Sequence, residues 1–535
     1  MNKKELWDIN LENNISIFIE KNLTDIKLFF IVFAVNIVIF GQKIFFLSLA
    51  TDDYRAHNYV YNKDMYLARM SGRWAKELFD NYIFVDELQV LPYIHSVIGV
   101  LAFTLIGFLT AKYFKRANKL EIVIITLLIS ASPMFAHNLY FSLNFPVWFT
   151  AAFAVIGFLM FSKTNKFIKL SGFVLMIIAI GNYQTIVQVI AAMIIFKAIL
   201  ELMQVASIDG IKDIFLNTVM SILFIALAYL ASVGINEYIL HYNNLTSGSR
   251  YKTAENIMEI SVYIDRVISM YRHTVHLHYF NVKLLIMYKI LGGLSIFGII
   301  FITLRKKTNL NVKFVSFLLI ILLFLSIPII VNLPLITGNW IPPRAHYAIG
   351  WILAGLFAIQ MSSFHGIFKT LSTLLTVSII IVSIYYINIF FDAANRQTSS
   401  DISRANQIVN RIRMNKNYIT EPMQFKIVGR KNFSVIGWKS YQQALNTDWS
   451  KYETFKYFTD FKFTAIKDKR NENKDNNIIG IANNEYHEVK KYLIKKGEII
   501  NAYPGKNSII VYKGKAILFL DSNTINAEIR LSKQQ

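Results

Sequence analysis

The chain contains no cysteine, which excludes disulfide scaffolds, cysteine-ligated zinc, iron–sulfur clusters and thiol nucleophiles. Charged residues are also scarce: they make up 17% of the sequence, against about a quarter in soluble proteins. Because 54% of the 535 residues are hydrophobic, most of the chain is expected to lie in a lipid bilayer. Any chemistry therefore depends on carboxylates, histidines, hydroxyls or cations.

Long apolar runs fill the first three quarters of the chain. A helix needs about 20 apolar residues to cross the hydrocarbon core of a membrane. Eleven runs approach or reach that length, although several are shorter, and they predict a polytopic α-helical membrane protein of about 11 transmembrane helices. The runs are 28–49, 91–110, 122–135, 145–161, 170–180, 186–202, 214–233, 284–304, 314–335, 345–361 and 371–391.

Lysine and arginine concentrate in the connections after the second, fourth and eighth runs, at 112–119, 163–169 and 305–313. Because basic residues are retained on the cytoplasmic side, these connections predict a cytoplasmic N-terminal segment, 1–27, and a C-terminus outside. Basic loops beside anionic lipid also account for much of the net charge of +22 that lies outside the C-terminal tail, so no nucleic-acid partner is expected.

Three segments on the expected outer side are too long to be simple connections. Two are loops, 51–90 and 238–283, within a transmembrane domain at 28–391. The third is the tail at 392–535, whose 25 basic and 14 acidic residues contribute half of the net charge.

The tail predicts a small extracytoplasmic α/β domain. Alternating apolar residues at 425–429 and 508–520 indicate strands, and Lys513-Gly514 indicates a hairpin turn. Residues Glu485–Lys496 indicate a surface helix.

Carboxylates are few and unevenly placed. Only eight lie between residues 97 and 391, and none is in the middle of an apolar run, which disfavours an ion-coupled transporter. The loop 51–90 alone holds seven, beginning with Asp52-Asp53 directly after the first run. A carboxylate at this boundary suits a general base, or the pair begins a helix as a cap.

The string TDDYRAHNYVYNKDMYLARMSGRW, 51–74, resembles the first outer loop of multi-pass GT-C glycosyltransferases. It is most similar to bacterial Gtr-type glucosyltransferases, which use undecaprenyl phosphate as the sugar carrier. The resemblance lies in the acid pair, an arginine two positions later, and Ser71-Gly72-Arg73-Trp74. Weaker similarity follows at Tyr183-Gln184, PPRAHYA (342–348) and YPGKNSIIV (503–511). Residues 131–146 contain no acid, unlike some relatives.

The resemblance implies a GT-C-like enzyme of the bacterial cytoplasmic membrane that acts on its outer face. It would move a hexose, here glucose, from a polyprenyl-phosphate donor to a surface polysaccharide such as O-antigen. Phosphate is a competent leaving group, so a single inverting displacement with one carboxylate base suffices. The base would be Asp52 or Asp53, with Asp52 preferred. No cofactor and no metal are expected.

Further roles follow by residue type. Arginine matches phosphate oxygens, which makes Arg344 the first candidate for the donor phosphate, although any single outer arginine also suits an interface anchor. The alternatives are Arg250, Arg272, Arg55 and Arg73. The candidates for the sugar or the acceptor are Trp74, His137, Asn138, Tyr183, Gln184, Trp340 and His346; for the two tryptophans an interfacial aromatic belt is the favoured alternative.

Two alternatives remain open at this stage. The histidines at 273, 276 and 278 could hold a metal, but an amphipathic helix at the membrane interface is favoured. A lipid-linked glycan flippase or transporter, or a surface-glycan polymerase or ligase, would also have many spans and long outer loops.

Overall fold

The computed structural model describes residues 11–50, 53, 72–79, 92–116, 118–142, 145–245, 260–275, 282–333, 345–346, 348–429, 445, 451–465, 484–505 and 507–534. The chain forms two compact units. The helical unit comprises Met1–Phe45, Asn62–Tyr140 and Asn144–Ile389. The mixed unit comprises Phe46–Tyr61, Phe141–Leu143 and Phe390–Gln535.

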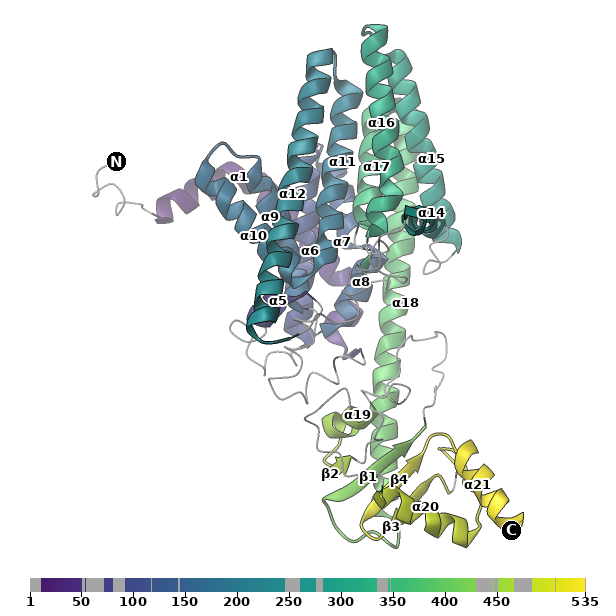
Figure 1. The fold of residues 1–535 in the computed structure, drawn as a ribbon. Coiled ribbons are helices and arrows are strands. Elements are labelled where there is room, and N and C mark those ends of the chain that lie inside the picture. The colour runs from purple at the N-terminus through teal and green to yellow at the C-terminus, as the bar shows by residue number, and fades with distance from the viewer. Residues whose placement is uncertain are drawn as a thin grey trace. The chain divides into compact units, whose positions relative to one another are not determined.

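Every one of the eleven apolar runs overlaps a helix (Figure 1). The helices are α1 (Leu11–Ile39), α2 (Gly41–Phe45), α5 (Trp74–Leu78), α6 (Pro92–Tyr113), α7 (Lys119–Ser130), α8 (Pro133–Tyr140), α9 (Phe145–Phe161), α10 (Lys166–Asn182), η4 (Gln184–Ile186, a 3₁₀ turn), α11 (Val187–Gln204), α12 (Ile208–Tyr242), α14 (Ile260–Val275), α15 (Val282–Arg305), α16 (Leu310–Val331), α17 (Ile349–Ser363) and α18 (Gly366–Arg413).

Seven helices in the described part of the chain are long and apolar enough to cross a membrane: α1, α6, α11, α12, α15, α16 and α18. The pair α7 and α8 adds an eighth if it is counted as one span bent by 45°. The helices α9 and α17 are apolar but shorter, so the expected count of eleven spans is not confirmed. The polytopic helical architecture itself is confirmed.

Side-chain caps fix where several helices begin. Asn118, Asn165, Ser207 and Asn309 each accept a hydrogen bond from a backbone N–H in the first turn of α7, α10, α12 and α16, respectively. Such a cap satisfies a donor that the helix leaves unpaired. Three of the capped starts, α7, α10 and α16, follow the lysine- and arginine-rich connections, so polar sequence ends one helix and starts the next.

Aromatic packing and a few polar links hold the helical unit together. Phe103 stacks on Phe135 with ring centroids 3.8 Å apart. The Trp351 indole N–H donates to the Thr110 hydroxyl at 3.0 Å, which joins α17 to α6. By contrast, α12, α15 and α16 expose large apolar side chains such as Leu230 and Phe314, as helices facing lipid do.

The mixed unit is built around a four-stranded sheet of order β2-β1-β4-β3. The strands are β1 (Met423–Val428), β2 (Phe463–Ala465), β3 (Ile509–Tyr512) and β4 (Lys515–Phe519). Strand β1 runs parallel to β2 and β4, whereas β3 and β4 are antiparallel. The helices of this unit are α19 (Lys451–Phe458), α20 (Asn484–Lys496) and α21 (Asn523–Gln534).

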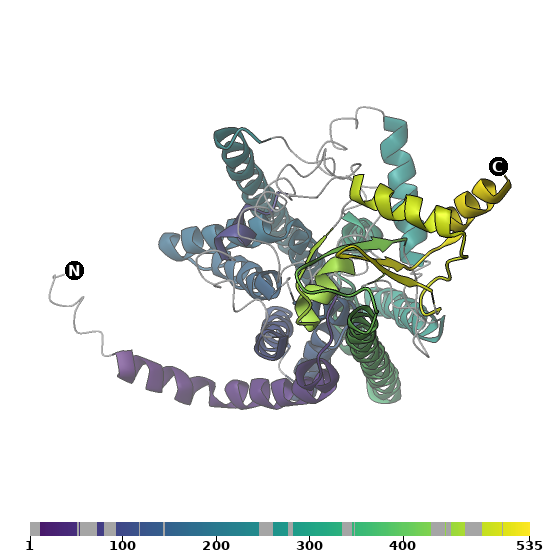
Figure 2. The same cartoon turned by 90° about the horizontal axis from the view of Figure 1, so that it is seen from below.

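Each face of the sheet carries its own core. Phe425 and Leu518 pack with the end of α18 and with α19 on one face. Ile517 and Phe519 pack with α20 and α21 on the other. In the view from below, these two helices lie along one side of the strands (Figure 2). The unit is therefore a three-layer α/β arrangement.

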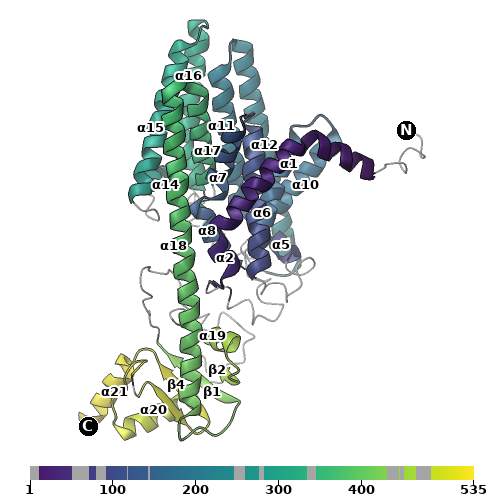
Figure 3. The ribbon, with the colours of Figure 1, turned by 180° about the vertical axis from the view of Figure 1, so that it is seen from behind.

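The predicted hairpin and surface helix are confirmed. Lys513 and Gly514 both have positive φ, 44° and 72°, as the tight turn between β3 and β4 requires. The predicted helix at 485–496 is α20. The last span differs from the prediction, because α18 continues to Arg413 rather than ending near residue 391 (Figure 3). Its extension buries Ala405, Ile408 and Ile412 against the sheet.

Candidate active site

Two sequence motifs that lie far apart in the chain meet in the helical unit. The Gln184 side-chain amide donates to the Gly72 carbonyl oxygen at 2.9 Å. The Arg73 guanidinium lies over the Tyr183 ring, 4.5 Å from its centroid. Gly72 has a φ of 73°, which glycine adopts without strain and which leads the chain into α5. We call Gly72, Arg73, Trp74, Tyr183 and Gln184 the motif cluster.

Trp74 anchors this cluster. Its indole N–H donates to the Ser232 hydroxyl of α12 at 3.1 Å, and the side chain is buried. The ring lies directly on Gly181 of α10, where a Cβ would stand 2.4 Å from the indole Nε1 and Cε2 atoms. Trp74 is thus enclosed between helices rather than exposed to a membrane boundary.

The candidate phosphate-binding arginines differ in burial and in whether the structure describes them. Arg73 is half-buried in the motif cluster, whereas Arg272 is exposed on α14. Arg55, Arg250 and Arg344 lie outside the described residues.

Of the acid pair, Asp53 is described and Asp52 is not. Asp53 belongs to the mixed unit and is buried, 7% exposed. Its Oδ2 atom accepts a hydrogen bond from the Ala50 N–H at 2.9 Å, and its own N–H donates to the Ala50 carbonyl at 3.0 Å. The Leu49 N–H donates to the Thr398 hydroxyl of α18 at 3.0 Å. The Asp53 carboxylate is therefore fixed within an ordered turn.

The remaining candidates have separate settings. Asn138 of α8 is buried, and its amide donates to the Met134 carbonyl of its own helix at 3.1 Å. His137 beside it is half-buried, and His346 is buried. Trp340 lies outside the described residues.

Lys43 and His95 were missed by the sequence analysis. Lys43 of α2 is fully buried, and His95 of α6 is 4% exposed. A lysine that interrupts the first apolar run was the available signal, because a buried cation in a span commonly marks a functional position.

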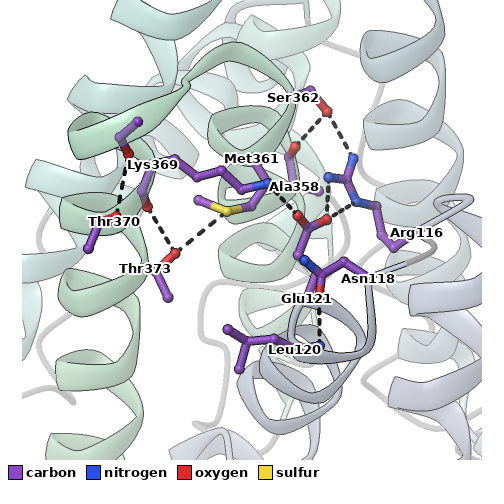
Figure 4. Close-up of polar contacts among 11 residues, drawn as sticks. Arg116, Asn118, Leu120, Glu121, Ala358, Met361, Ser362, Lys369, Thr370 and Thr373 are labelled. Carbon is purple, nitrogen blue, oxygen red and sulfur yellow. Dashed lines mark hydrogen bonds and ion pairs between the residues drawn. The ribbon is translucent and has the colours of Figure 1, made fainter.

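One buried acid, Glu121, forms ion pairs that link helices rather than belonging to the motif cluster (Figure 4). Glu121 of α7 receives the Arg116 guanidinium, with Nε 2.7 Å from Oε2, and the Lys369 ammonium 3.0 Å from Oε1. Arg116 also donates to the Ser362 hydroxyl at 2.9 Å. These contacts tie the α6–α7 connection to the end of α17 and the start of α18.

The candidate metal ligands were the histidines at 273, 276 and 278. Within the described ranges, no group of three or more histidine, aspartate or glutamate residues could hold a metal ion. His276 and His278 lie outside those ranges, and the side chain of His273 is not described.

The apolar helices, capped at basic connections and joined by buried polar links, define an integral membrane protein with a motif cluster inside its helical unit. Residues 43–359 match the family model described as "Glucosyl transferase GtrII". Because the match covers more than half of the chain, the protein belongs to the GtrII glucosyltransferase family and is a glycosyltransferase. The Gtr-type resemblance of the first loop is thereby confirmed. No curated protein and no solved structure matches the chain.

Proposed function

We propose that the protein transfers glucose from undecaprenyl phosphate to a cell-surface polysaccharide, such as O-antigen, at the outer face of the bacterial cytoplasmic membrane. The observation that carries this proposal is the GtrII match, which spans every candidate site residue from Asp52 to His346. The contacts between the two motifs of the motif cluster, both within the matched region, also support the proposal, because each motif contributed to the resemblance on its own.

The reaction is a single inverting displacement. The acceptor hydroxyl attacks C1 of the glucose while the bond from C1 to the phosphate oxygen breaks. The carboxylate base takes the hydroxyl proton, and the bonding electrons leave with the polyprenyl phosphate. Asp52 is the proposed base. Asp53, whose Oδ2 is bound by the Ala50 N–H, would orient the pair.

The departing phosphate needs cations. Arg73, Arg344, Arg250, Arg272 and Arg55 are the proposed set, since the guanidinium fork matches phosphate oxygens. The position of Arg73 over the Tyr183 ring, within the motif cluster, supports its inclusion.

The sugar and the acceptor would be contacted by Trp74, His137, Asn138, Tyr183, Gln184, Trp340 and His346. We propose that the basic connections at 112–119, 163–169 and 305–313 face the cytoplasm together with the N-terminus, and that residues 392–535 form an extracytoplasmic domain.

The test is glucosyl transfer by the purified full-length protein in liposomes, with undecaprenyl-phosphate glucose and the polysaccharide acceptor. Asp52→Asn and Asp53→Asn are compared with Asp209→Asn, which changes an exposed carboxylate in the first turn of α12. Loss of the base lowers the rate by about 100-fold or more, and Asp209→Asn leaves it unchanged. Full activity in both acid-pair variants would sink the assignment. Transfer without any ion gradient separates the enzyme from a transporter, and an unchanged chain length of the glycan separates it from a polymerase.

A further inference from the structure

Three buried carboxamides lie beside the motif cluster. Asn182 and Gln188 are fully buried, and Asn236 is 1% exposed. In the part of the chain that the structure describes, neither the amide nitrogen nor the amide oxygen of any of the three has a hydrogen-bond partner. Buried polar groups are nearly always paired, so three complete exceptions require an explanation.

Two of these side chains adjoin the contacts that hold Trp74. Asn182 is the last residue of α10 and directly follows Gly181, on which the Trp74 ring lies. Asn236 lies one helical turn beyond Ser232, the acceptor of the Trp74 indole N–H, and both side chains are on the buried face of α12.

Gln188 lies on the segment that follows the Tyr183-Gln184 motif along the chain. It lies four residues after Gln184, which binds the Gly72 carbonyl, and follows it along η4 and α11. Each of the three carboxamides is therefore within one turn of a residue that contacts the cluster.

Elsewhere in the same unit, the buried carboxamides of Asn36 and Gln360 are paired through their amide nitrogens. The Asn36 amide nitrogen donates to the hydroxyls of Thr104 and Ser130, at 2.9 and 2.8 Å. Gln360 donates to the Leu291 carbonyl at 2.7 Å and to the Ser295 hydroxyl at 3.0 Å. In these two side chains only the amide oxygen lacks a partner among the described residues, whereas in the three beside the motif cluster both the nitrogen and the oxygen do.

The chemistry of the three groups indicates what they would bind. A carboxamide offers a donor and an acceptor without charge, which matches a hydroxyl group that also donates and accepts. A phosphate would call for cations or N–H donors, and a metal ion for carboxylates or histidines. A neutral ring with several hydroxyl groups fits the set best.

We infer that Asn182, Gln188 and Asn236 bind the hydroxyl groups of the glucose that is transferred. The inference rests on the proposed function and adds the sugar-binding residues to it. The amides are enclosed in this structure, so the sugar enters when the packing around Trp74 opens. The short helix α5, which begins at Trp74, contacts α10 and α12, so its displacement would expose Asn182 and Asn236.

The experiment replaces each amide by a leucine of similar size, in the full-length protein: Asn182→Leu, Gln188→Leu and Asn236→Leu, with Asn36→Leu as the matched control. Each site variant lowers kcat/KM for undecaprenyl-phosphate glucose by about tenfold. Its unfolding temperature stays the same or rises, because an unpaired buried amide is removed. Asn36→Leu lowers the unfolding temperature and leaves KM unchanged.

A second readout uses binding alone. The shift in unfolding temperature is measured with undecaprenyl-phosphate glucose and, separately, with undecaprenyl phosphate. The difference between the two shifts measures the stabilisation that binding of the glucose contributes. The wild type shows a difference that each site variant reduces. The inference is overturned if the wild type shows none, or if the site variants keep wild-type kinetics while losing stability. Absence of transfer by a wild type that still shows the sugar-dependent shift would refute the proposed function instead.

Discussion

Replacing Gly181 by alanine tests whether the two motifs form one packed site. An added Cβ would stand 2.4 Å from two indole atoms of Trp74 and 2.7 Å from a third. Real carbon contacts are about 3.5–4.0 Å, so the ring would have to move by roughly 1 Å. The hydrogen bond from Trp74 to Ser232 holds the ring in place against that movement.

Two effects of opposite sign decide how much Gly181→Ala changes the free energy of unfolding. Overpacking a buried site destabilises by about 1–3 kcal/mol. An alanine in place of a helical glycine stabilises by up to about 1 kcal/mol. Gly234→Ala in α12 serves as the control for helix propensity alone, because Gly234 is exposed and a Cβ there meets nothing within 4 Å. Gly181→Ala should therefore be less stable than Gly234→Ala by about 1–3 kcal/mol.

The assay is denaturant unfolding of both variants and the wild type in the same detergent, together with glucosyl transfer in liposomes. Gly181→Ala should also lose transfer activity, since Trp74 leaves its position, while Gly234→Ala keeps it. Equal stability and equal activity of the two variants would refute the contact between α10 and Trp74.

Three further predictions concern stability. Glu121→Gln removes the charge that Arg116 and Lys369 share and should destabilise by about 3 kcal/mol in detergent unfolding. Ser362→Ala removes the hydroxyl that accepts from Arg116 and donates to the Ala358 carbonyl, and it should cost about 1 kcal/mol. Equal losses in the two variants would contradict this. Hydrogen bonds from Lys515 and Lys513 lower the pKa of Glu488 below its ordinary value of 4.5, so its contribution is present above that pH and is lost as the pH falls through the folded pKa. The unfolding temperature of the wild type should fall more steeply than that of Glu488→Gln below pH 4.5, and high salt should shrink the difference. Gly514→Ala places a side chain at a φ of +72° in otherwise open space and should cost about 1 kcal/mol, measured as faster amide exchange in β3 and β4.

Helix positions were predictable, because an apolar run long enough for a bilayer has to satisfy its backbone internally. Membrane crossing was less so. The helices α7, α9, α10 and α17 have 12, 17, 17 and 15 residues. These lengths fall below the roughly 20 residues that a full span needs. The apolar composition of a run does not by itself show how long its helix is.

The end of α18 shows a second limit. Residues 392–413 are polar enough to suggest that a span has ended, yet they continue the helix. Ala405, Ile408 and Ile412 recur at helical spacing and are buried against the sheet of the mixed unit. The helical spacing of these apolar residues is present in the sequence. It is their packing against the sheet, however, that stabilises this part of the helix, and the spacing alone does not predict that packing.

The amides of the candidate site mark a third limit. A search for acidic groups in the apolar runs finds none in the middle of a run, and it passes over Asn182, Gln188 and Asn236 because they carry no charge. Sequence could not have separated them from structural amides, since a helix often pairs an asparagine with its own carbonyl, as Asn388 does with that of Ile384 at 2.9 Å. In a membrane, where water does not compensate, an amide left unpaired by its own helix is expected to find a partner on another helix or in a ligand. The distinction lies in the contacts rather than in the residue type, so in this protein the neutral polar residues, and not the acids alone, define where a sugar would bind.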